Sequence, residues 1–151
     1  DCMTGLSNRQ VFENALDDLK KNPGEPFTLI FYDLNHLKLA NDKYGHDMGD
    51  LHLQKAAEFI SASCPGASAC CRIGGDEFVT IFRGRSSRLA SASIQKLDSL
   101  ILQFNRSGTF PFSFSVAYGT AKSTYDVPLS PDEALKAADH EMYLNKQMKE
   151  Q

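Results

Sequence analysis

Residues 74–78 place two glycines before two adjacent carboxylates, in the order Gly-Gly-Asp-Glu-Phe. Two apolar, strand-like runs flank this segment, at 69–73 and 78–82. Because glycine adopts positive φ without strain, two glycines between strands predict a tight hairpin. Asp76 and Glu77 would then stand at a rigid tip beside bare backbone. Carboxylates, bare backbone and rigid support are what a metal-phosphate site requires.

A further carboxylate, Asp33, follows an apolar run at 27–32 that is typical of a strand buried on both faces. Asp33 is either an N-cap for the next helix, since aspartate is a favoured cap, or a partner of Asp76 across adjacent strands. Two carboxylates and a backbone carbonyl, such as that of Leu34, make an oxygen-rich Mg²⁺ site with room for phosphate oxygens. The amides that open the following helix, at 35–38, would face an anion, although an ordinary turn also explains them.

Asn41 and Asp50 flank a segment, Gly45-His46-Asp47-Met48-Gly49, that is predicted to be a flexible loop. A carboxylate accepts hydrogen bonds from N1 and N2 of guanine, and an Asn amide donates to O6 or N7. The two residues together would therefore select GTP over ATP. Taken singly, each is better explained as a helix-surface Asn or an N-cap Asp.

The elements that must position these groups alternate between helix and strand. Helices are expected from the capping pattern Ser7-Asn8-Arg9-Gln10, over 36–43, 50–62 and 88–104, and from Ser130-Pro131-Asp132-Glu133. Strands are expected over 27–32, in a hairpin at 69–82, and over 112–119. This order resembles a βαββαβ pattern, an α/β (α+β) palm-like core with a central, mostly antiparallel sheet flanked by helices. It predicts that the end of the first strand and the hairpin tip share one edge.

Composition limits the classes of protein to consider. The chain has 151 residues, 42% apolar, with a net charge of −3, as expected for a single globular domain without a nucleic-acid-coating surface. No apolar run is long enough to span a bilayer. The four cysteines lack zinc spacing, which favours free thiols in a reducing cytosol. Because the chain opens at Asp1, we expect a domain taken from a longer multidomain signalling protein.

Five ordered motifs resemble those of the GGDEF domain, the diguanylate cyclase family. They are the opening Asp1 to Arg9, the run Asp33-Leu34-Asn35-His36-Leu37-Lys38, the residues Asn41-Asp42 with Tyr44-Gly45-His46 and Gly49-Asp50, the signature Arg72 to Phe78, and the closing Ala138-Asp139 with Tyr143 and Lys146. The resemblance covers nearly the full length. It implies that residues 1–151 form one domain with the fold of GGDEF and nucleotidyl cyclase domains.

The resemblance also implies an activity. Members of the family condense two GTP into cyclic di-GMP and release two pyrophosphates, in a head-to-tail homodimer with Mg²⁺ (or Mn²⁺). By matched position, the implied catalytic residues are Asp76, Glu77 and Asp33, the cation ligands are Asp33, Asp76 and the Leu34 carbonyl, and the GTP contacts are Asn41, Asp50, His36, Leu37, Lys38, Gly75 and Lys146. An N-terminal sensor domain and a cytoplasmic location are expected for the parent protein, with no nucleic-acid or direct membrane contact.

Several positions depart from the family pattern. Asn35 and Leu37 replace a usual Asp and Phe, and Ala117 replaces a Gly. Lys149-Glu150 stand where Gly-Arg is usual, which places a carboxylate near the implied triphosphate. Residues 65–68 lack the R-x-x-D motif, so no primary inhibitory site of that type is predicted.

Other functions remain open at this point. The chain could be a catalytically weak or inactive GTP-binding regulatory module, a dimerisation module without a nucleotide, or a nucleotidyl cyclase or polymerase palm with the same two-acid geometry.

Overall fold

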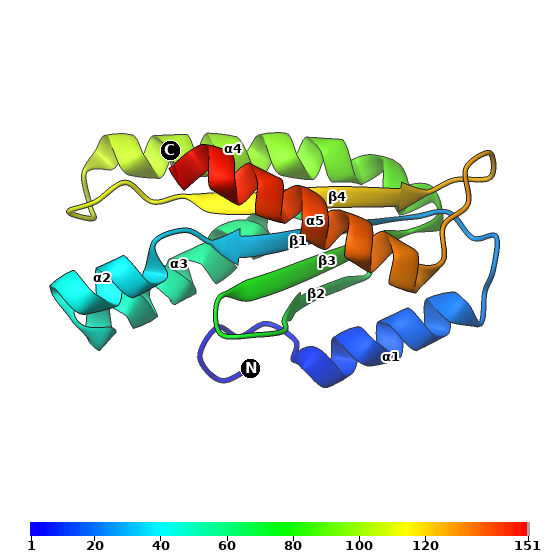
Figure 1. Cartoon of the computed structure of the whole chain (residues 1–151), viewed down its shortest axis with the longest axis horizontal. Helices are drawn as coiled ribbons and strands as arrows, with labels where there is room; N and C mark the ends of the chain where they lie inside the picture. Colours follow the sequence, from blue (N-terminus) through cyan, green and yellow to red (C-terminus); the bar gives the residue numbers. More distant parts are fainter. Residues whose placement is uncertain (151) are drawn as a thin grey trace.

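A four-stranded sheet with the order β2-β3-β1-β4 forms the centre of the protein, and every neighbouring pair of strands is antiparallel (Figure 1). The computed structural model describes residues 1–150, with side chains through residue 148. The strands are β1 (Phe27–Leu34), β2 (Ala69–Arg72), β3 (Glu77–Arg83) and β4 (Val116–Ser123). The helices are α1 (Arg9–Lys20), α2 (Leu37–Tyr44), α3 (His46–Ser63), the 3-10 helix η1 (Gly84–Leu89), α4 (Ala90–Ser107) and α5 (Pro131–Glu150). The predicted fold class is therefore confirmed.

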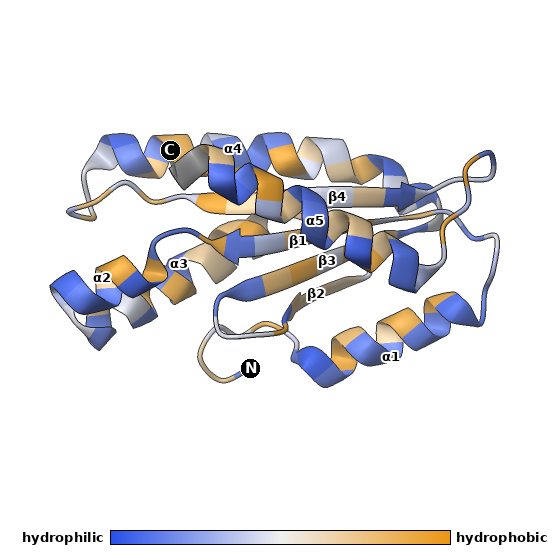
Figure 2. Cartoon of the chain, viewed as in Figure 1, coloured by the Kyte–Doolittle hydropathy of each residue, from blue (hydrophilic) through white to orange (hydrophobic). Residues whose placement is uncertain are grey.

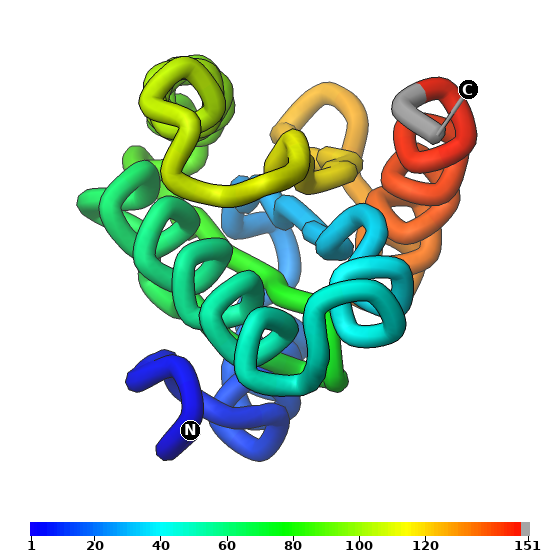
Figure 3. The backbone as a smooth tube through the Cα atoms, turned by 90° about the vertical axis from the view of Figure 1, so that its left-hand side faces the viewer, coloured from blue at the N-terminus to red at the C-terminus, as the bar shows by residue number. Residues whose placement is uncertain are grey.

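Helices cover both faces of the sheet, so the protein has three layers (Figure 3). α1 and α5 pack on one face and α3 and α4 on the other. Successive side chains of β1 alternate between the two cores: Leu29 and Phe31 face α1 and α5, whereas Ile30 and Tyr32 face α3 and α4. This double burial explains why the strand is a continuous apolar run. The outer helix α1 instead alternates apolar and polar residues along its length (Figure 2).

The last helix, α5, lies very close to the edge strand β4. An ideal Cβ on Gly119 would lie 2.1 Å from the carbonyl oxygen of Ala138 and 2.3 Å from the backbone nitrogen of Met142. Only glycine fits between these backbones. The backbone N–H of Tyr118 donates to Oδ1 of Asn145 at 3.1 Å. These contacts fix the position of α5, and therefore of Lys146 on its C-terminal half.

The two predicted helix starts have different outcomes. The start of α5 is confirmed as a capping box, because Glu133 N donates to Ser130 Oγ at 3.1 Å and Ser130 N donates to Glu133 Oε1 at 3.3 Å. The capping box at Ser7 is wrong. Asn8 is the N-cap of α1, and Ser7 instead forms an isolated bridge with Cys71 of β2.

The predicted loop at 45–49 is also wrong. Gly45, with φ at +92°, is the single residue between α2 and α3, and α3 begins at His46. Asp50 consequently lies inside α3 and is not an N-cap. The expected helix at 50–62 is real but begins one turn earlier.

Two further elements are displaced from their predicted positions. The strand expected at 112–119 is β4 at Val116–Ser123. Phe112 and Phe114 lie before this strand and pack against His52 of α3, and the centroid of each phenyl ring lies 5.0 Å from the centroid of the imidazole. The helix expected at 88–104 is η1 followed by α4. Within residues 1–150, no helix combines the length and apolar character needed to cross a membrane.

Candidate functional site

The end of β1 and the tip of the β2–β3 hairpin lie together, as the sequence predicts. Asp33 pairs with Glu77 in the β1–β3 register, and the backbone N–H of Leu34 donates to the carbonyl oxygen of Asp76 at 3.0 Å. The N-cap interpretation of Asp33 is wrong, because Asp33 lies within β1 and the N-cap of α2 is His36.

Arginine side chains hold the hairpin tip from outside. Arg72 donates to the carbonyl oxygen of Gly74 at 3.1 Å and to that of Gly75 at 2.8 and 3.2 Å, and it forms an ion pair with Asp1 at 3.1 Å. Arg9 donates to the carbonyl oxygen of Ile73 at 3.0 Å. The N-terminal segment therefore supports the tip. The expected positive φ at the two tip glycines is not observed, and a Cβ on Gly75 would meet open space.

The carboxylate of Asp33 has an unusual environment. Its side chain is 16% exposed, and burial together with the nearby carboxylate of Asp76 raises the pKa of Asp33 to about 7, while Lys146 opposes this shift. Lys146 Nζ lies 3.2 Å from Asp33 Oδ2. The other oxygen, Oδ1, is buried without a hydrogen-bond partner among the described residues. Burial and Asp76 also raise the pKa of Glu77. A buried anionic oxygen without a partner suits a cation.

An open cavity of about 370 Å³ adjoins these carboxylates. Its lining comes from the end of β1, the start of α2, the hairpin tip and α5: Leu34, His36, Leu37, Lys38, Leu39, Asp42, Asp76 and Lys146. His36 has φ at +63°, the one positive φ of a non-glycine residue in the described chain, and no side chain caps α2 there. Strained backbone and uncapped helix amides at a cavity are typical of an anion site.

Among the described residues, no three His, Cys, Asp or Glu side chains form a metal cluster. A cation here would rely on Asp33, Asp76, the Leu34 carbonyl and oxygens from a bound ligand. That donor set fits Mg²⁺ or Mn²⁺, which take few carboxylates and bind substrate phosphates.

Asn41 and Asp50 lie outside this cavity, on the pair of helices that packs beside it. Asn41 is on α2 and Asp50 on α3. An ideal Cβ on Gly49 would lie 1.6 Å from Asn41 Oδ1, so the Asn41 amide occupies space that only a glycine leaves open. The fit between Gly49 and Asn41 was not predicted, because it depends on how α2 packs against α3.

Three further residues of the site were also missed by sequence reasoning. Asp42 and Leu39 line the cavity, and Arg72 holds the tip. The sequence contains a signal for Arg72, since this arginine stands two residues before the first glycine of the glycine-acid segment. No comparable signal identifies Leu39, because leucine is an apolar residue type that is usual in a protein core.

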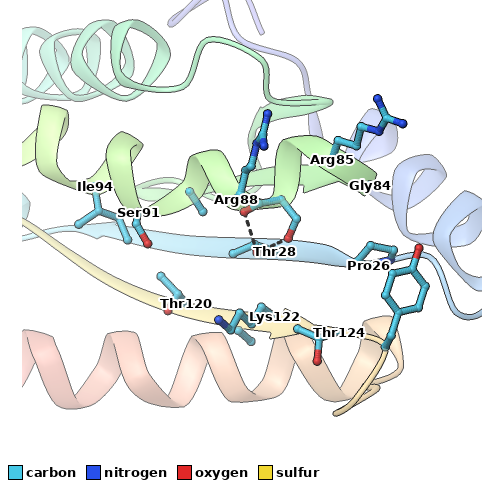
Figure 4. A pocket seen from close by; sticks show the side chains of 14 residues that line it. Pro26, Thr28, Gly84, Arg85, Arg88, Ser91, Ile94, Thr120, Lys122 and Thr124 are labelled. Atoms are coloured by element: carbon cyan, nitrogen blue, oxygen red, sulfur yellow. Dashed lines mark hydrogen bonds between the residues drawn. The ribbon is translucent and has the colours of Figure 1, made fainter.

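A larger cavity, of about 550 Å³, lies at the opposite end of the sheet (Figure 4). None of the predicted site residues lines it. Thr28 and Ser87 form a hydrogen bond of 2.6 Å within it, and Figure 4 shows Arg85 and Arg88 extending away from the sheet. The larger cavity is therefore not the one beside the carboxylates, and the candidate site is identified by the chemistry of the sheet edge at Asp33.

Comparisons with known proteins agree on one family. A family model described as "Diguanylate cyclase, GGDEF domain" matches residues 1–151. Diguanylate cyclase DgcP of Escherichia coli is 34% identical over 99% of this chain and 45% of its own length. Diguanylate cyclase VdcA of Vibrio cholerae is 30% identical over 81% of this chain and 37% of its own length. The chain thus spans less than half of these curated relatives.

Solved structures show the same fold. The GGDEF domain of DgcB from Caulobacter crescentus, solved in complex with c-di-GMP, superposes with a TM-score of 0.82 at 24% identity, over 98% of this chain and 90% of that one. A GGDEF-only form of YfiN from Pseudomonas aeruginosa superposes with a TM-score of 0.74 at 28% identity, over 98% of this chain and 88% of that one.

Proposed function

Because the chain belongs to the GGDEF family of diguanylate cyclase domains, we propose that it condenses two GTP into cyclic di-GMP with release of two pyrophosphates. The reaction takes place in a head-to-tail homodimer in which each protomer holds one GTP with Mg²⁺ or Mn²⁺. The observation that supports this proposal best is the buried Oδ1 of Asp33, which has no hydrogen-bond partner in the described part of the chain and lies beside the cavity that Asp76 and Lys146 line.

Each element of the site has a part in holding the substrate. Asp33, Asp76 and the Leu34 carbonyl would hold the cation, which would supply positive charge to neutralise the phosphates. The uncapped amides at His36, Leu37 and Lys38 receive the β- and γ-phosphates at the start of α2. Lys146 reaches the terminal phosphates from α5.

The helix pair α2–α3 selects the base. Asp50 accepts hydrogen bonds from N1 and N2 of guanine, and Asn41 donates to O6 or N7. Adenine lacks the donor edge that Asp50 requires, so ATP would leave this carboxylate unpaired.

Gly75, which is exposed at the tip, lets the substrate approach the hairpin backbone.

The bond changes require two protomers. The 3′-hydroxyl of each GTP attacks the α-phosphorus of the other, so that two O–P bonds form and the two bonds to pyrophosphate break. Asp76 assists removal of the hydroxyl proton. Glu77 provides a second carboxylate at the same hairpin tip. Because each domain binds one GTP, positioning by the dimer supplies much of the rate.

The surroundings of the domain are part of the proposal. We infer a longer cytoplasmic parent with an N-terminal sensor domain that controls dimer formation. We also infer that the loop at 65–68 binds no inhibitory cyclic di-GMP, because it lacks the R-x-x-D motif. Calorimetry on the monomer would contradict this inference if it detected tight binding of cyclic di-GMP.

The decisive test of activity is an assay on a forced dimer, made by fusing a parallel coiled coil to the N-terminus. With GTP and Mg²⁺, chromatography should detect cyclic di-GMP. Asp76→Ala should abolish it, whereas Asp126→Ala, which removes an exposed carboxylate before α5, should not. Absence of product from the unmodified dimer, with GTP shown to bind, would contradict catalysis.

That negative outcome would support the alternative, a GTP-binding regulatory module with weak or no turnover. The replacement of the usual Gly-Arg by Lys149-Glu150 favours this alternative, because a carboxylate near a triphosphate is repulsive. The side chains of these two residues lie outside the described part of the structure.

A further inference from the structure

Lys146 lies where the divalent cation is expected to bind. Its Nζ is 3.2 Å from Asp33 Oδ2 and 3.5 Å from the carbonyl oxygen of Leu34. These are two of the three groups assigned above to the cation. The third, Asp76, lines the same cavity as Lys146. The lysine ammonium therefore contacts two of the oxygen ligands assigned to the metal ion and forms an ion pair with the carboxylate of Asp33.

The backbone of Lys146 cannot withdraw from this position. Gly119 allows the backbone of β4 to lie directly against the backbone of α5 at Ala138 and Met142. In addition, the backbone N–H of Tyr118 donates to Oδ1 of Asn145 at 3.1 Å. An exchange of partners would therefore take place through the side chain. Its stem has four carbons with freely rotating bonds, and the side chain is 24% exposed. Lys146 also lines the cavity together with the α2 amides that are proposed to hold the phosphates.

We propose that Lys146 is an exchangeable counter-ion. It binds Asp33 and Leu34 when the domain is empty, and it moves to the phosphates of GTP when a divalent cation takes those ligands. The ammonium and the cation cannot share the same oxygens, because like charges at such distances repel. A triphosphate in the cavity gives the displaced ammonium a new anionic partner. This inference rests on the cation site of the proposed function.

The exchange makes cation binding conditional on nucleotide. Without GTP, the cation must displace the ammonium from Asp33, and no phosphate is present to bind it. With GTP present, the same ammonium adds to nucleotide affinity. Lys146 therefore opposes binding of the cation alone and favours binding of the cation with GTP, which is a coupling between two ligands of one site.

Mn²⁺ titration, followed through the EPR signal of the free ion, tests this coupling. The variants are Lys146→Met, which keeps an unbranched stem without charge, and Lys136→Met, which removes an exposed α5 lysine outside the cavity. Without nucleotide, Lys146→Met should bind Mn²⁺ about fivefold more tightly, as expected for losing a half-buried ion pair. With Mn²⁺ present, its affinity for a non-hydrolysable GTP analogue should fall about tenfold, the effect of one charged hydrogen bond. Lys136→Met should match the unmodified protein in both measurements.

The opposite signs of the two effects distinguish the exchange from a structural role. If Lys146→Met binds Mn²⁺ no more tightly without nucleotide, or binds the analogue equally well, the inference is overturned while the cation site stands. If the unmodified protein binds no Mn²⁺ even with the analogue, the proposed function fails and the inference fails with it. Lys146→Gln is measured in parallel, and thermal unfolding verifies that each variant is folded.

Discussion

Gly49→Ala is the substitution that tests the assignment of the guanine site most sharply. Gly49 lies in the first turns of α3, where its missing side chain leaves space for the amide of Asn41. The added methyl carbon would lie 1.6 Å from Asn41 Oδ1 and 2.7 Å from its Cγ. The amide must therefore rotate out of its place, although residue 49 itself contacts no base in the proposed site.

The expected magnitudes separate stability from binding. Alanine is a better helix former than glycine by about 0.5–1 kcal/mol, which offsets part of the cost of moving the Asn41 amide. Global stability should therefore change little. GTP binding should lose the hydrogen bonds of Asn41 to guanine, each worth about 1 kcal/mol. Loss of one or two such bonds corresponds to about 5- to 30-fold weaker affinity.

Calorimetric titration with a non-hydrolysable GTP analogue and Mg²⁺ measures this effect. Gly49→Ala, Asn41→Ala and the double variant should all bind the analogue with the same reduced affinity, because the first change acts through the second residue. Affinity for the matching ATP analogue should fall less, because adenine has no O6 acceptor. Additive losses in the double variant, or full GTP affinity in Gly49→Ala beside a loss in Asn41→Ala, would show that Gly49 does not act through the Asn41 amide.

Three further predictions follow from the packing and the charges. Gly119→Ala forces the backbones of β4 and α5 apart, so the free energy of unfolding in urea should fall by about 3 kcal/mol or more, and an unchanged value would contradict the close approach. His52 is fully buried and has no hydrogen-bond partner among the described residues, and burial lowers its pKa from 6.5 to about 4. Below pH 6.5 the unfolded chain therefore binds the proton that the folded one excludes, and stability should fall by about 2 kcal/mol between pH 7.5 and 5 through this residue. His52→Leu should remove that part of the slope, and equal slopes in the two proteins would show that His52 is protonated in the fold. Arg72→Met removes the donors to the Gly74 and Gly75 carbonyls, so tip amides should exchange hydrogen faster and kcat of the forced dimer should fall about tenfold, whereas unchanged exchange would show that the tip is rigid without it.

Local patterns in the sequence predict a helix or strand correctly where the residues of that element alone determine its structure. The apolar run of β1 and the capping box of α5 are both local signals, and both are confirmed. The shared edge of Asp33 and Asp76 follows from strand order alone. Sequence reasoning was wrong where partners distant in the chain decide the outcome.

Two errors illustrate the physical reason. Residues 45–49 have the composition of a loop, yet four of them are helical. Glycine is needed at position 49 of this helix because the Asn41 amide of α2 leaves no room there for a side chain. Phe112 and Phe114 alternate as in a strand, but the imidazole of His52 on α3 provides an aromatic partner away from the sheet. Both outcomes depend on contacts between elements.

The hairpin tip shows the same limit within the candidate site. The glycine pattern predicts a tip made rigid by its own backbone, whereas guanidinium groups of Arg72 and Arg9 donate hydrogen bonds to the carbonyl oxygens there. Lys146 was assigned to phosphate from its motif alone. Its contact with Asp33 could not be foreseen, because it depends on how closely α5 approaches β4.

A crystal soaked with Mn²⁺ and a non-hydrolysable GTP analogue would show the proposed cation and nucleotide sites together, because anomalous scattering locates the cation independently of the nucleotide. We predict one Mn²⁺ bound to Asp33 Oδ1, a carboxylate oxygen of Asp76 and the analogue's phosphates, with guanine between Asn41 and Asp50. A nucleotide that binds elsewhere, or a cation that does not touch Asp33 and Asp76, would contradict it.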